Sequence, residues 1–285
     1  MNELFVRKEL ERFLLEDLGR TDVSVGAGSL VEARIIAEEG GVFCGGRFLL
    51  PLLNLLVPAG SDPVRVRYLL PEGTPLADKK LTTVAVIIAD AEIVRHGVRA
   101  ALNLIQHLSG IATNVAQKVS EVEGTGARLL DTRKTTPGFR VFEKYAVRVG
   151  GGYNHRFNRE DGILIKKEDI VIDGGIIPAI DRAFVSKAHL TEIEIEVETL
   201  EELECVLGDG RVTHILLDNM TPEMLRKAVL RCGKTHVLEA SGVGGRDVRE
   251  IAETGVQYIS LSSLIRGARP LTMKMRITKV MPAGE

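Results

Sequence analysis

Residues 214–223 are His214-Ile215-Leu216-Leu217-Asp218-Asn219-Met220-Thr221-Pro222-Glu223. A short apolar run ends in two polar residues, and a threonine followed by proline then marks the start of a helix. An apolar run followed by helical sequence is the order that parallel βα units produce along a chain. This stretch therefore predicts one βα unit of a parallel sheet.

The pattern recurs through the second half of the chain. Helix signals lie between the apolar runs, among them Thr199 followed by two glutamates and a run at Arg246–Thr254 that ends at Gly255. Together with His214–Leu217 the apolar runs predict an open six-stranded parallel β/α barrel, where a full barrel of this type has eight strands. The other five runs are Ala127–Leu130, Gly162–Ile165, Ile193–Ile195, Thr235–Leu238 and Gln257–Leu261.

The first half has a mixed order. An amphipathic helix precedes a strand near Val31–Ala37, and β-like runs follow at Val64–Leu70 and Thr82–Ile88. This order predicts an α+β domain over residues 1–112, beside a barrel domain over residues 113–270, so the overall class is α/β. A helix from about Ala91 to Ser120 is expected to bridge the two domains. The alternation in Leu271–Val280 is typical of an edge strand, and we expect residues 271–285 to return to the first domain.

The composition excludes several classes of protein. Lys plus Arg (37) nearly cancel Asp plus Glu (39), and aromatic residues make up only 4% with no Trp, so we expect no nucleic-acid partner. The apolar runs are far shorter than the roughly 20 residues that cross a bilayer, so we expect no membrane partner and a cytoplasmic protein. Cys44, Cys205 and Cys232 lack zinc-site or disulfide spacing and resemble small buried hydrophobes in a reducing compartment.

Polar, chemically active residues follow all six apolar runs. In a parallel β/α barrel the carboxyl ends of the strands converge on one mouth, so residues far apart in the sequence share one pocket. Random placement on the surface would rarely produce this pattern. The residues expected at the mouth are Asp131 through Gly138, Lys166, Glu196, Asp218-Asn219, Glu239 through Gly242, and Ser262-Ser263.

The charges at this mouth indicate what it binds. Arg133, Lys134, Arg156 and Lys166, with His155 beside them, predict a cationic pocket suited to a ligand rich in carboxylate and phosphate. Either arginine alone is as readily explained as a structural ion-pair partner. The prediction therefore depends on their convergence.

Two acidic positions and a glycine turn complete the predicted site. Glu196 and Asp218 are lone carboxylates, and such a pair in a phosphate-rich site commonly holds Mg²⁺ together with several waters. Glu196 also belongs to the alternating stretch Glu192–Glu198, which is usually a solvated strand face. The turn Ser241–Gly245 precedes a helix and is able to present backbone N–H groups to a phosphate. These features predict a sugar-pyrophosphate site beside a carboxylate site.

Segments spread over most of the chain carry a family resemblance. The most specific are Asp131-Thr132-Arg133-Lys134-Thr135-Thr136-Pro137-Gly138 and Gly150-Gly151-Gly152-Tyr153-Asn154-His155-Arg156. The others are Glu16–Arg20, Ala101–Thr113, Leu164–Lys166, Leu217–Met220, Glu239–Gly242 and Ala252–Val256. In these segments the chain resembles the quinolinate phosphoribosyltransferases, also called carboxylating nicotinate-nucleotide pyrophosphorylases. The resemblance implies an enzyme of NAD biosynthesis that transfers phosphoribosyl from phosphoribosyl pyrophosphate to quinolinate, with loss of carbon dioxide.

The resemblance also implies a homodimer, or a multiple of it, and roles for individual residues. In the family an arginine of the long first-domain helix enters the partner's pocket, and Arg99 matches that position. The implied quinolinate-binding residues are Arg99, Arg133, His155, Arg156 and Lys166. The implied phosphoribosyl pyrophosphate-binding residues are Lys134, Thr135, Lys166, Glu196, Asp218, Ser241, Gly242, Ser262 and Ser263, with Glu196 and Asp218 as ligands of Mg²⁺.

Three other interpretations remain open. A nicotinate phosphoribosyltransferase would share the fold but bind one carboxylate, which needs fewer cations than this pocket holds. A barrel lyase or aldolase would use Lys166 as a Schiff base, yet it would have little use for Glu196, Asp218 and a phosphate turn in one mouth. A catalytically silent metabolite-binding barrel is permitted by departures from the family's usual residues at Ser262 and at Lys167-Glu168-Asp169.

Overall fold

The computed structural model describes residues 2–19, 29–61 and 63–281. The chain divides into two compact units, Met1–Asn114 with Ala268–Glu285, and Val115–Gly267. Two parts of the predictions lie outside the described residues. They are Arg20, in the family-like segment Glu16–Arg20, and residues 282–285, at the end of the expected C-terminal segment.

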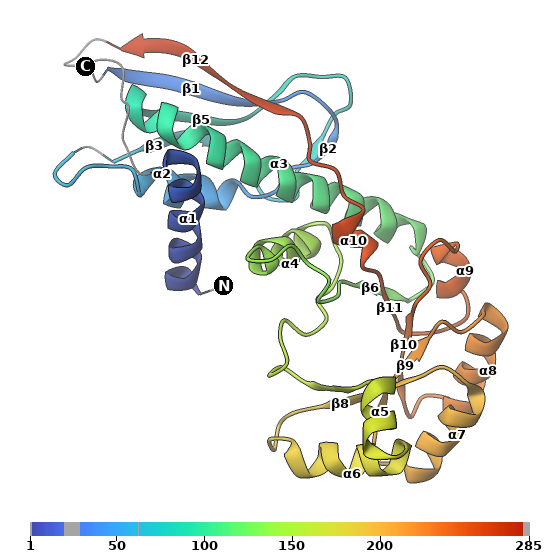
Figure 1. The fold of residues 1–285 in the computed structure, drawn as a ribbon. Helices are drawn as coiled ribbons and strands as arrows, with labels where there is room; N and C mark the ends of the chain where they lie inside the picture. Colours follow the sequence, from blue (N-terminus) through green and yellow to red (C-terminus); the bar gives the residue numbers. More distant parts are fainter. Residues whose placement is uncertain (1, 20–28, 62, 282–285) are drawn as a thin grey trace. The chain divides into compact units, whose positions relative to one another are not determined.

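The first unit is built on an antiparallel sheet with the strand order β12-β1-β5-β3 (Figure 1). β12 pairs with β1 along its length, from Met273 opposite Ala37 to Met281 opposite Leu30, which confirms the predicted edge strand. A separate two-stranded pair consists of β2 (Gly41–Val42) and β4 (Pro75–Leu76). The strands of the main sheet are β1 (Leu30–Ala37), β3 (Arg65–Leu69), β5 (Thr82–Asp90) and β12 (Met273–Met281).

Three α-helices and a 3₁₀ turn belong to this unit, the last helix continuing into the second. They are α1 (Glu3–Leu18), η1 (Gly46–Phe48), α2 (Leu49–Asn54) and α3 (Ala91–Glu121). The side chain of Asn2 caps α1 by accepting hydrogen bonds from two backbone N–H groups. α3 confirms the long helix predicted at this position. It touches α2 at Gly97, where a Cβ atom would lie 2.4 Å from Leu53 Cδ2, so a larger residue there would require Leu53 to move.

The second unit contains six parallel strands in the order β6-β11-β10-β9-β8-β7, which confirms the predicted six-stranded β/α fold (Figure 1). The sheet is open, with β6 and β7 at its two edges. The strands are β6 (Arg128–Leu130), β7 (Ile163–Ile165), β8 (Ile193–Val197), β9 (His214–Asp218), β10 (Val237–Ser241) and β11 (Tyr258–Ser260). The helices are α4 (Arg140–Val149), α5 (Lys167–Asp173), α6 (Ile176–Ser186), α7 (Leu200–Asp209), α8 (Pro222–Cys232), α9 (Val248–Ala252) and α10 (Ser263–Arg266).

Alternation along the barrel strands separates two kinds of side chain. In β8 the apolar Ile193 and Ile195 are buried, whereas Glu194 and Glu196 line cavities inside the barrel. In β10 Glu239 lies in register with Leu216 of β9 and Tyr258 of β11. The predicted fifth run, Thr235–Leu238, was therefore placed too early, because the strand continues through inward-facing polar residues to Ser241.

Two further expectations can be compared with the structure. Among the described residues, no helix combines the length and apolar character needed to cross a membrane. Cys44 and Cys232 are buried as expected, but Cys205 is exposed on α7, so the prediction of a buried residue was wrong there.

Candidate active site

A cavity of about 180 Å³ opens at the carboxyl ends of the barrel strands. It unites residues from five strands and from the loops after β6 and α4, as the convergence argument predicts. The predicted site residues that line it are Arg133, Lys134, His155, Arg156, Lys166, Glu196 and Ser241. Thr132, Leu164, Leu216, Glu239 and Ser260 complete the wall.

The cavity is lined by closely spaced cations. Burial lowers the pKa of Arg156, and the nearby guanidinium of Arg133 lowers it further. Arg156 donates a hydrogen bond of 2.6 Å to the carbonyl oxygen of Gly162, which holds its side chain in place. Arg133 and Lys134 are exposed in the loop after β6. A bound anion would relieve the repulsion between the two arginines, so the arrangement favours a ligand with several negative charges.

A buried network holds the backbone that carries His155 and Arg156. Lys144 of α4 forms an ion pair with Asp131, and neither side chain is exposed to solvent. Lys144 Nζ also donates to the carbonyl oxygen of His155 (2.8 Å), and Asp131 accepts the N–H of His155 (3.0 Å). Asn154 donates to the second carboxylate oxygen of Asp131. The segment is thus bonded on both its N–H and C=O sides.

The ring of His155 points into the barrel, toward Glu194 and Glu239. Its Nε2 lies 3.2 Å from Glu194 Oε2 and 3.6 Å from Glu239 Oε2. These three side chains have the donor types of a metal site. However, Nδ1 accepts the backbone N–H of Arg156 at 2.8 Å, so in the neutral ring the hydrogen sits on Nε2. The cluster therefore favours a hydrogen bond from His155 to a carboxylate over metal ligation.

The other side of the mouth carries two carboxylates and one ammonium. They belong to Glu196, Asp218 and Lys166. Lys166 Nζ lies 3.8 Å from Glu196 Oε2. Burial raises the pKa of Glu196, Lys166 opposes the rise and Asp218 adds to it, which indicates that the two carboxylates are near one another. The solvated-face interpretation of Glu196 is wrong, because this side chain is 9% exposed. Carboxylate oxygens in a partly hydrated mouth are the donors that Mg²⁺ prefers.

The ends of β9 and β10 are locked together beside this group. The N–H of Asn219 donates to the carbonyl oxygen of Ser241 (3.0 Å), and both Asn219 and Gly242 have positive φ angles, of 57° and 70°. A Cβ atom on Gly242 would lie 2.2 Å from Asn219 Oδ1. The close approach requires glycine and leaves Ser241 facing the cavity.

Some predicted residues lie outside the cavity wall. Asp218 is close enough to raise the pKa of Glu196 but does not itself line the cavity, and neither does Gly242. Thr135 accepts a hydrogen bond from Arg140 instead of facing the cavity. Ser262 and Ser263 lie at the start of the four-residue helix α10 and do not line the cavity. Arg99 is exposed on α3, in the part of that helix that belongs to the first unit.

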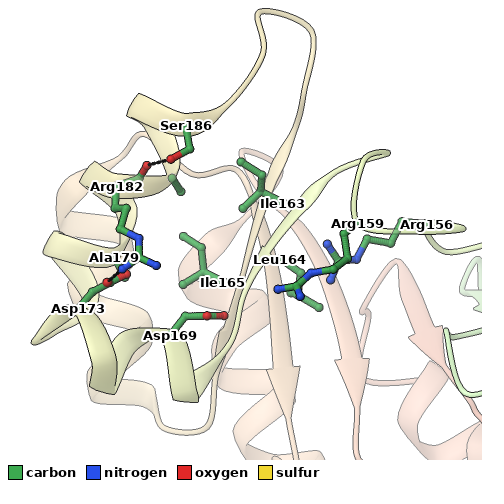
Figure 2. Close-up of a pocket in the computed structure, with 11 residues that line it drawn as sticks. Arg156, Arg159, Ile163, Leu164, Ile165, Asp169, Asp173, Ala179, Arg182 and Ser186 are labelled. Carbon is green, nitrogen blue, oxygen red and sulfur yellow. Dashed lines mark hydrogen bonds and ion pairs between the residues drawn. The ribbon is translucent and has the colours of Figure 1, made fainter.

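A second cavity, of about 230 Å³, lies between β7 and the helices α5 and α6 (Figure 2). Asp173 and Arg182 form an ion pair at one end, and Arg156 and Arg159 lie toward the other. Arg156 lines both cavities, because β7 is an edge strand and leaves the barrel open there. Arg159 lines this cavity but not the mouth, which makes it a matched control for Arg156.

Two models of one protein family cover most of the chain. The quinolinate phosphoribosyl transferase N-terminal domain matches residues 20–109, and the C-terminal domain of the same enzyme matches residues 111–276. The chain belongs to the quinolinate phosphoribosyltransferase family. Both units of the structure thus have counterparts in this family.

Relatives of the family match nearly the whole chain. A probable nicotinate-nucleotide pyrophosphorylase [carboxylating] of Bacillus subtilis is 36% identical over 98% of this chain and 95% of its own length. The nicotinate-nucleotide pyrophosphorylase [carboxylating] of Mycobacterium leprae is 37% identical over 93% of this chain and 94% of its own length. The crystal structure of NadC from Streptococcus pyogenes superposes with a TM-score of 0.86, at 32% identity over 97% of this chain and 98% of that one.

Several residues of this quinolinate phosphoribosyltransferase site escaped the sequence analysis. Glu194 was missed, and Glu239, although expected at the mouth, was not predicted to reach His155, because the register between β8 and β10 is absent from the sequence. Lys144 and Arg140 lie on α4, which reads as an ordinary amphipathic helix. The signal available for Lys144 was its apolar surroundings, since Phe142, Ala146 and Val147 are buried beside it.

Proposed function

We propose that this chain joins quinolinate to phosphoribosyl pyrophosphate and releases pyrophosphate and carbon dioxide, giving nicotinate mononucleotide. The observation that carries the proposal is the convergence of two arginines and two lysines on a mouth that also holds a pair of carboxylates. Quinolinate has two adjacent carboxylates, and phosphoribosyl pyrophosphate needs both cations and a metal site.

The proposal assigns the quinolinate carboxylates to Arg133, Arg156 and Lys166, with Arg99 supplied by the partner subunit of a homodimer. His155 borders the same cavity, but its ring nitrogens are engaged with Arg156 and Glu194. We therefore assign it to the floor of the pocket, where a shift of the ring on binding would bring Nε2–H to a substrate carboxylate.

The phosphoribosyl pyrophosphate is assigned to the opposite side of the mouth. Lys134 and Lys166 face the pyrophosphate, Glu196 and Asp218 hold Mg²⁺, and the turn at Ser241-Gly242 faces the 5′-phosphate, with Thr135, Ser262 and Ser263 as its more distant surroundings. Bound Mg²⁺ would neutralise part of the charge on the pyrophosphate oxygens.

Catalysis in this proposal needs no protein nucleophile. The pyridine nitrogen forms a bond to C1 of the ribose as the bond from C1 to pyrophosphate breaks, and the 2-carboxylate then leaves as carbon dioxide with a proton taking its place on the ring. The chain's cations orient the two substrates and stabilise the departing charge. Leu164 and Leu216 supply an apolar part of the cavity wall.

The rival interpretations fit the geometry less well. Lys166 is half exposed and lies 3.8 Å from Glu196, so it lacks the apolar pocket in which a Schiff-base lysine is usually placed. A nicotinate enzyme would leave one cation of the Arg133 and Arg156 pair without a carboxylate. The proposed compartment is the cytoplasm, in keeping with three cysteines that form no disulfide.

The direct test is a turnover assay with purified protein, quinolinate, phosphoribosyl pyrophosphate and Mg²⁺. We expect nicotinate mononucleotide and pyrophosphate to form in equal amounts, and we expect chelation of Mg²⁺ to stop the reaction. Quinolinate that binds without any nucleotide product, under conditions where a B. subtilis relative is assayed in parallel and is active, would favour the silent binding barrel.

A further inference from the structure

Helix α4 contacts both of the loops that carry the site's arginines. Arg140, its first residue, donates from Nη1 to the carbonyl oxygen of Phe157 (2.9 Å) in the loop of Arg156. The same guanidinium donates from Nε to Thr135 Oγ1 (3.0 Å) and from Nη2 to the carbonyl oxygen of Arg133 (3.3 Å) in the other loop. One side chain therefore bridges the two loops.

Two neighbouring residues of α4 strengthen this bridge. The buried carboxylate of Glu143 accepts the N–H of Thr136 at 2.9 Å, in the loop of Arg133. The buried ammonium of Lys144 binds Asp131, directly after β6. It also donates to the carbonyl oxygen of His155, in the loop that carries Arg156. Arg140, Glu143 and Lys144 form what we call the α4 clamp.

The clamp acts on two groups that repel each other. The guanidinium of Arg133 lies close enough to Arg156 to lower the pKa of the latter, after the larger effect of burial. Free loops would relax and move these two charges apart, and a ligand would then have to restore their spacing at a cost in binding free energy. Loops held by a rigid helix keep the spacing before the ligand arrives.

We propose that the α4 clamp is a positioning device that presets the distance between Arg133 and Arg156 to match two adjacent carboxylates, and so determines the preference for a dicarboxylate. The inference rests on the proposed function, because it names what sets the substrate specificity of that same site. None of the three clamp residues lines the mouth, so each acts through the loops and not on the substrate.

Stability alone is a weak explanation for this network. A buried ion pair such as Lys144 with Asp131 often contributes little net stability, because removing both charges from water costs about as much as their attraction returns. The bonds of Arg140 go to loop acceptors on either side and not to its own helix. Such a placement favours a role in loop geometry.

The test uses two variants that perturb the clamp differently. Arg140→Met keeps the apolar stem and removes three hydrogen bonds near the surface. The double variant Asp131→Asn with Lys144→Met removes both buried charges together. Its amide oxygen still accepts the N–H of His155, whereas the hydrogen bond from Asn154 is lost. For both we expect kcat/KM with quinolinate to fall about ten- to a hundredfold, with KM for phosphoribosyl pyrophosphate changed by less than about threefold. Arg140→Lys should recover only part of the loss, because an ammonium cannot span the acceptors in both loops.

Arg148→Met is the matched control. Arg148 lies on the same helix, but its contacts, the carbonyl oxygen of Gly152 and the ring of Tyr153, lie at the start of one loop and do not join the two loops. We expect this variant to keep the wild-type ratio of quinolinate use to nicotinate use, whereas the clamp variants lower that ratio. Folding of each variant is checked by thermal unfolding, and quinolinate binding is measured by calorimetry.

The outcomes separate the two levels of the argument. A wild-type protein without activity toward quinolinate would contradict the proposed function. An active wild type, with folded clamp variants that keep both their quinolinate affinity and their acid preference, would overturn the positioning role. The positioning role would also be overturned if kcat/KM fell equally for quinolinate and nicotinate, in proportion to the fraction of folded protein.

Discussion

Glu239 is a carboxylate held inside the barrel, and its Oε1 has no hydrogen-bond partner within the described part of the chain. Burial raises the pKa of Glu239 and Glu194 adds to the rise, whereas His155 and Ser260 oppose it, with the result at about 7. The charge of Asp131 acts in the same direction as Glu194. The Glu239 carboxyl group, beneath the substrate pocket, therefore gains or loses its proton near neutral pH.

This residue predicts how stability depends on pH. Between its ordinary pKa of 4.5 and about 7, Glu239 keeps a proton in the folded state that the unfolded state releases. The free energy of unfolding should therefore fall as the pH rises through that window. Glu239→Gln should flatten the fall, whereas Glu192→Gln, an exposed position before β8, should leave it unchanged. Urea unfolding at pH 5 and pH 8 measures both, and an unaltered pH dependence in Glu239→Gln would contradict the argument.

The carboxylates at the mouth predict a different effect. Glu196→Gln or Asp218→Asn should raise the Mg²⁺ concentration needed for half-maximal rate and weaken use of phosphoribosyl pyrophosphate, because each removes an oxygen ligand's charge. Quinolinate binding without the second substrate should stay nearly unchanged. Glu198→Gln is the control, since Glu198 pairs with Lys167 outside the cavity. If both variants kept the wild-type turnover at limiting Mg²⁺, the assignment of Glu196 and Asp218 as metal ligands would be wrong.

At the scale of elements, the ends of β9 and β10 meet where Gly242 approaches Asn219. Gly242→Ala places a Cβ atom 2.2 Å from Asn219 Oδ1 at a positive φ, so the two strand ends must separate. We expect a loss of about 1–3 kcal/mol in stability and a raised KM for phosphoribosyl pyrophosphate. Gly244→Ala meets no atom within 4 Å and should be near neutral in both assays. Equal behaviour of the two variants would show that the close approach has no functional consequence.

The elements also show how far the sequence alone leads. All six barrel strands and the helix Ala91–Glu121 were predictable, because each strand holds a short apolar run followed by helical sequence and the helix has a long apolar period. β10 was placed too early and Glu196 was open to a solvated interpretation, because polar residues that face a barrel interior look the same in sequence as residues that face water. The clamp residues were missed because most of their partners are backbone atoms of the flanking loops, which no pattern of side chains reveals.

At the scale of the whole molecule, the proposed active site needs a second copy of the chain. Arg99 is exposed on α3, and the proposal assigns it to the pocket of a partner subunit. Arg99→Ala and Arg133→Ala should each be inactive but folded. After subunit exchange in an equal mixture, activity should return to about a quarter of the wild-type value, because half of the dimers are hybrids and each hybrid contains one intact site. Mixtures that remain inactive despite demonstrated exchange would place Arg99 within its own chain's site or outside the reaction.

The central claim is that the mouth is built for two carboxylates, and the ratio of kcat/KM for quinolinate to that for nicotinate tests it most directly. A charged partner left unpaired costs about 2–5 kcal/mol, so the wild type should prefer quinolinate by roughly thirtyfold or more. Arg156→Ala should remove most of this preference, Arg159→Ala should retain it, and carbon dioxide should form in step with the nucleotide. Equal use of the two acids by the wild type, or nucleotide formed from quinolinate without carbon dioxide, would contradict the account.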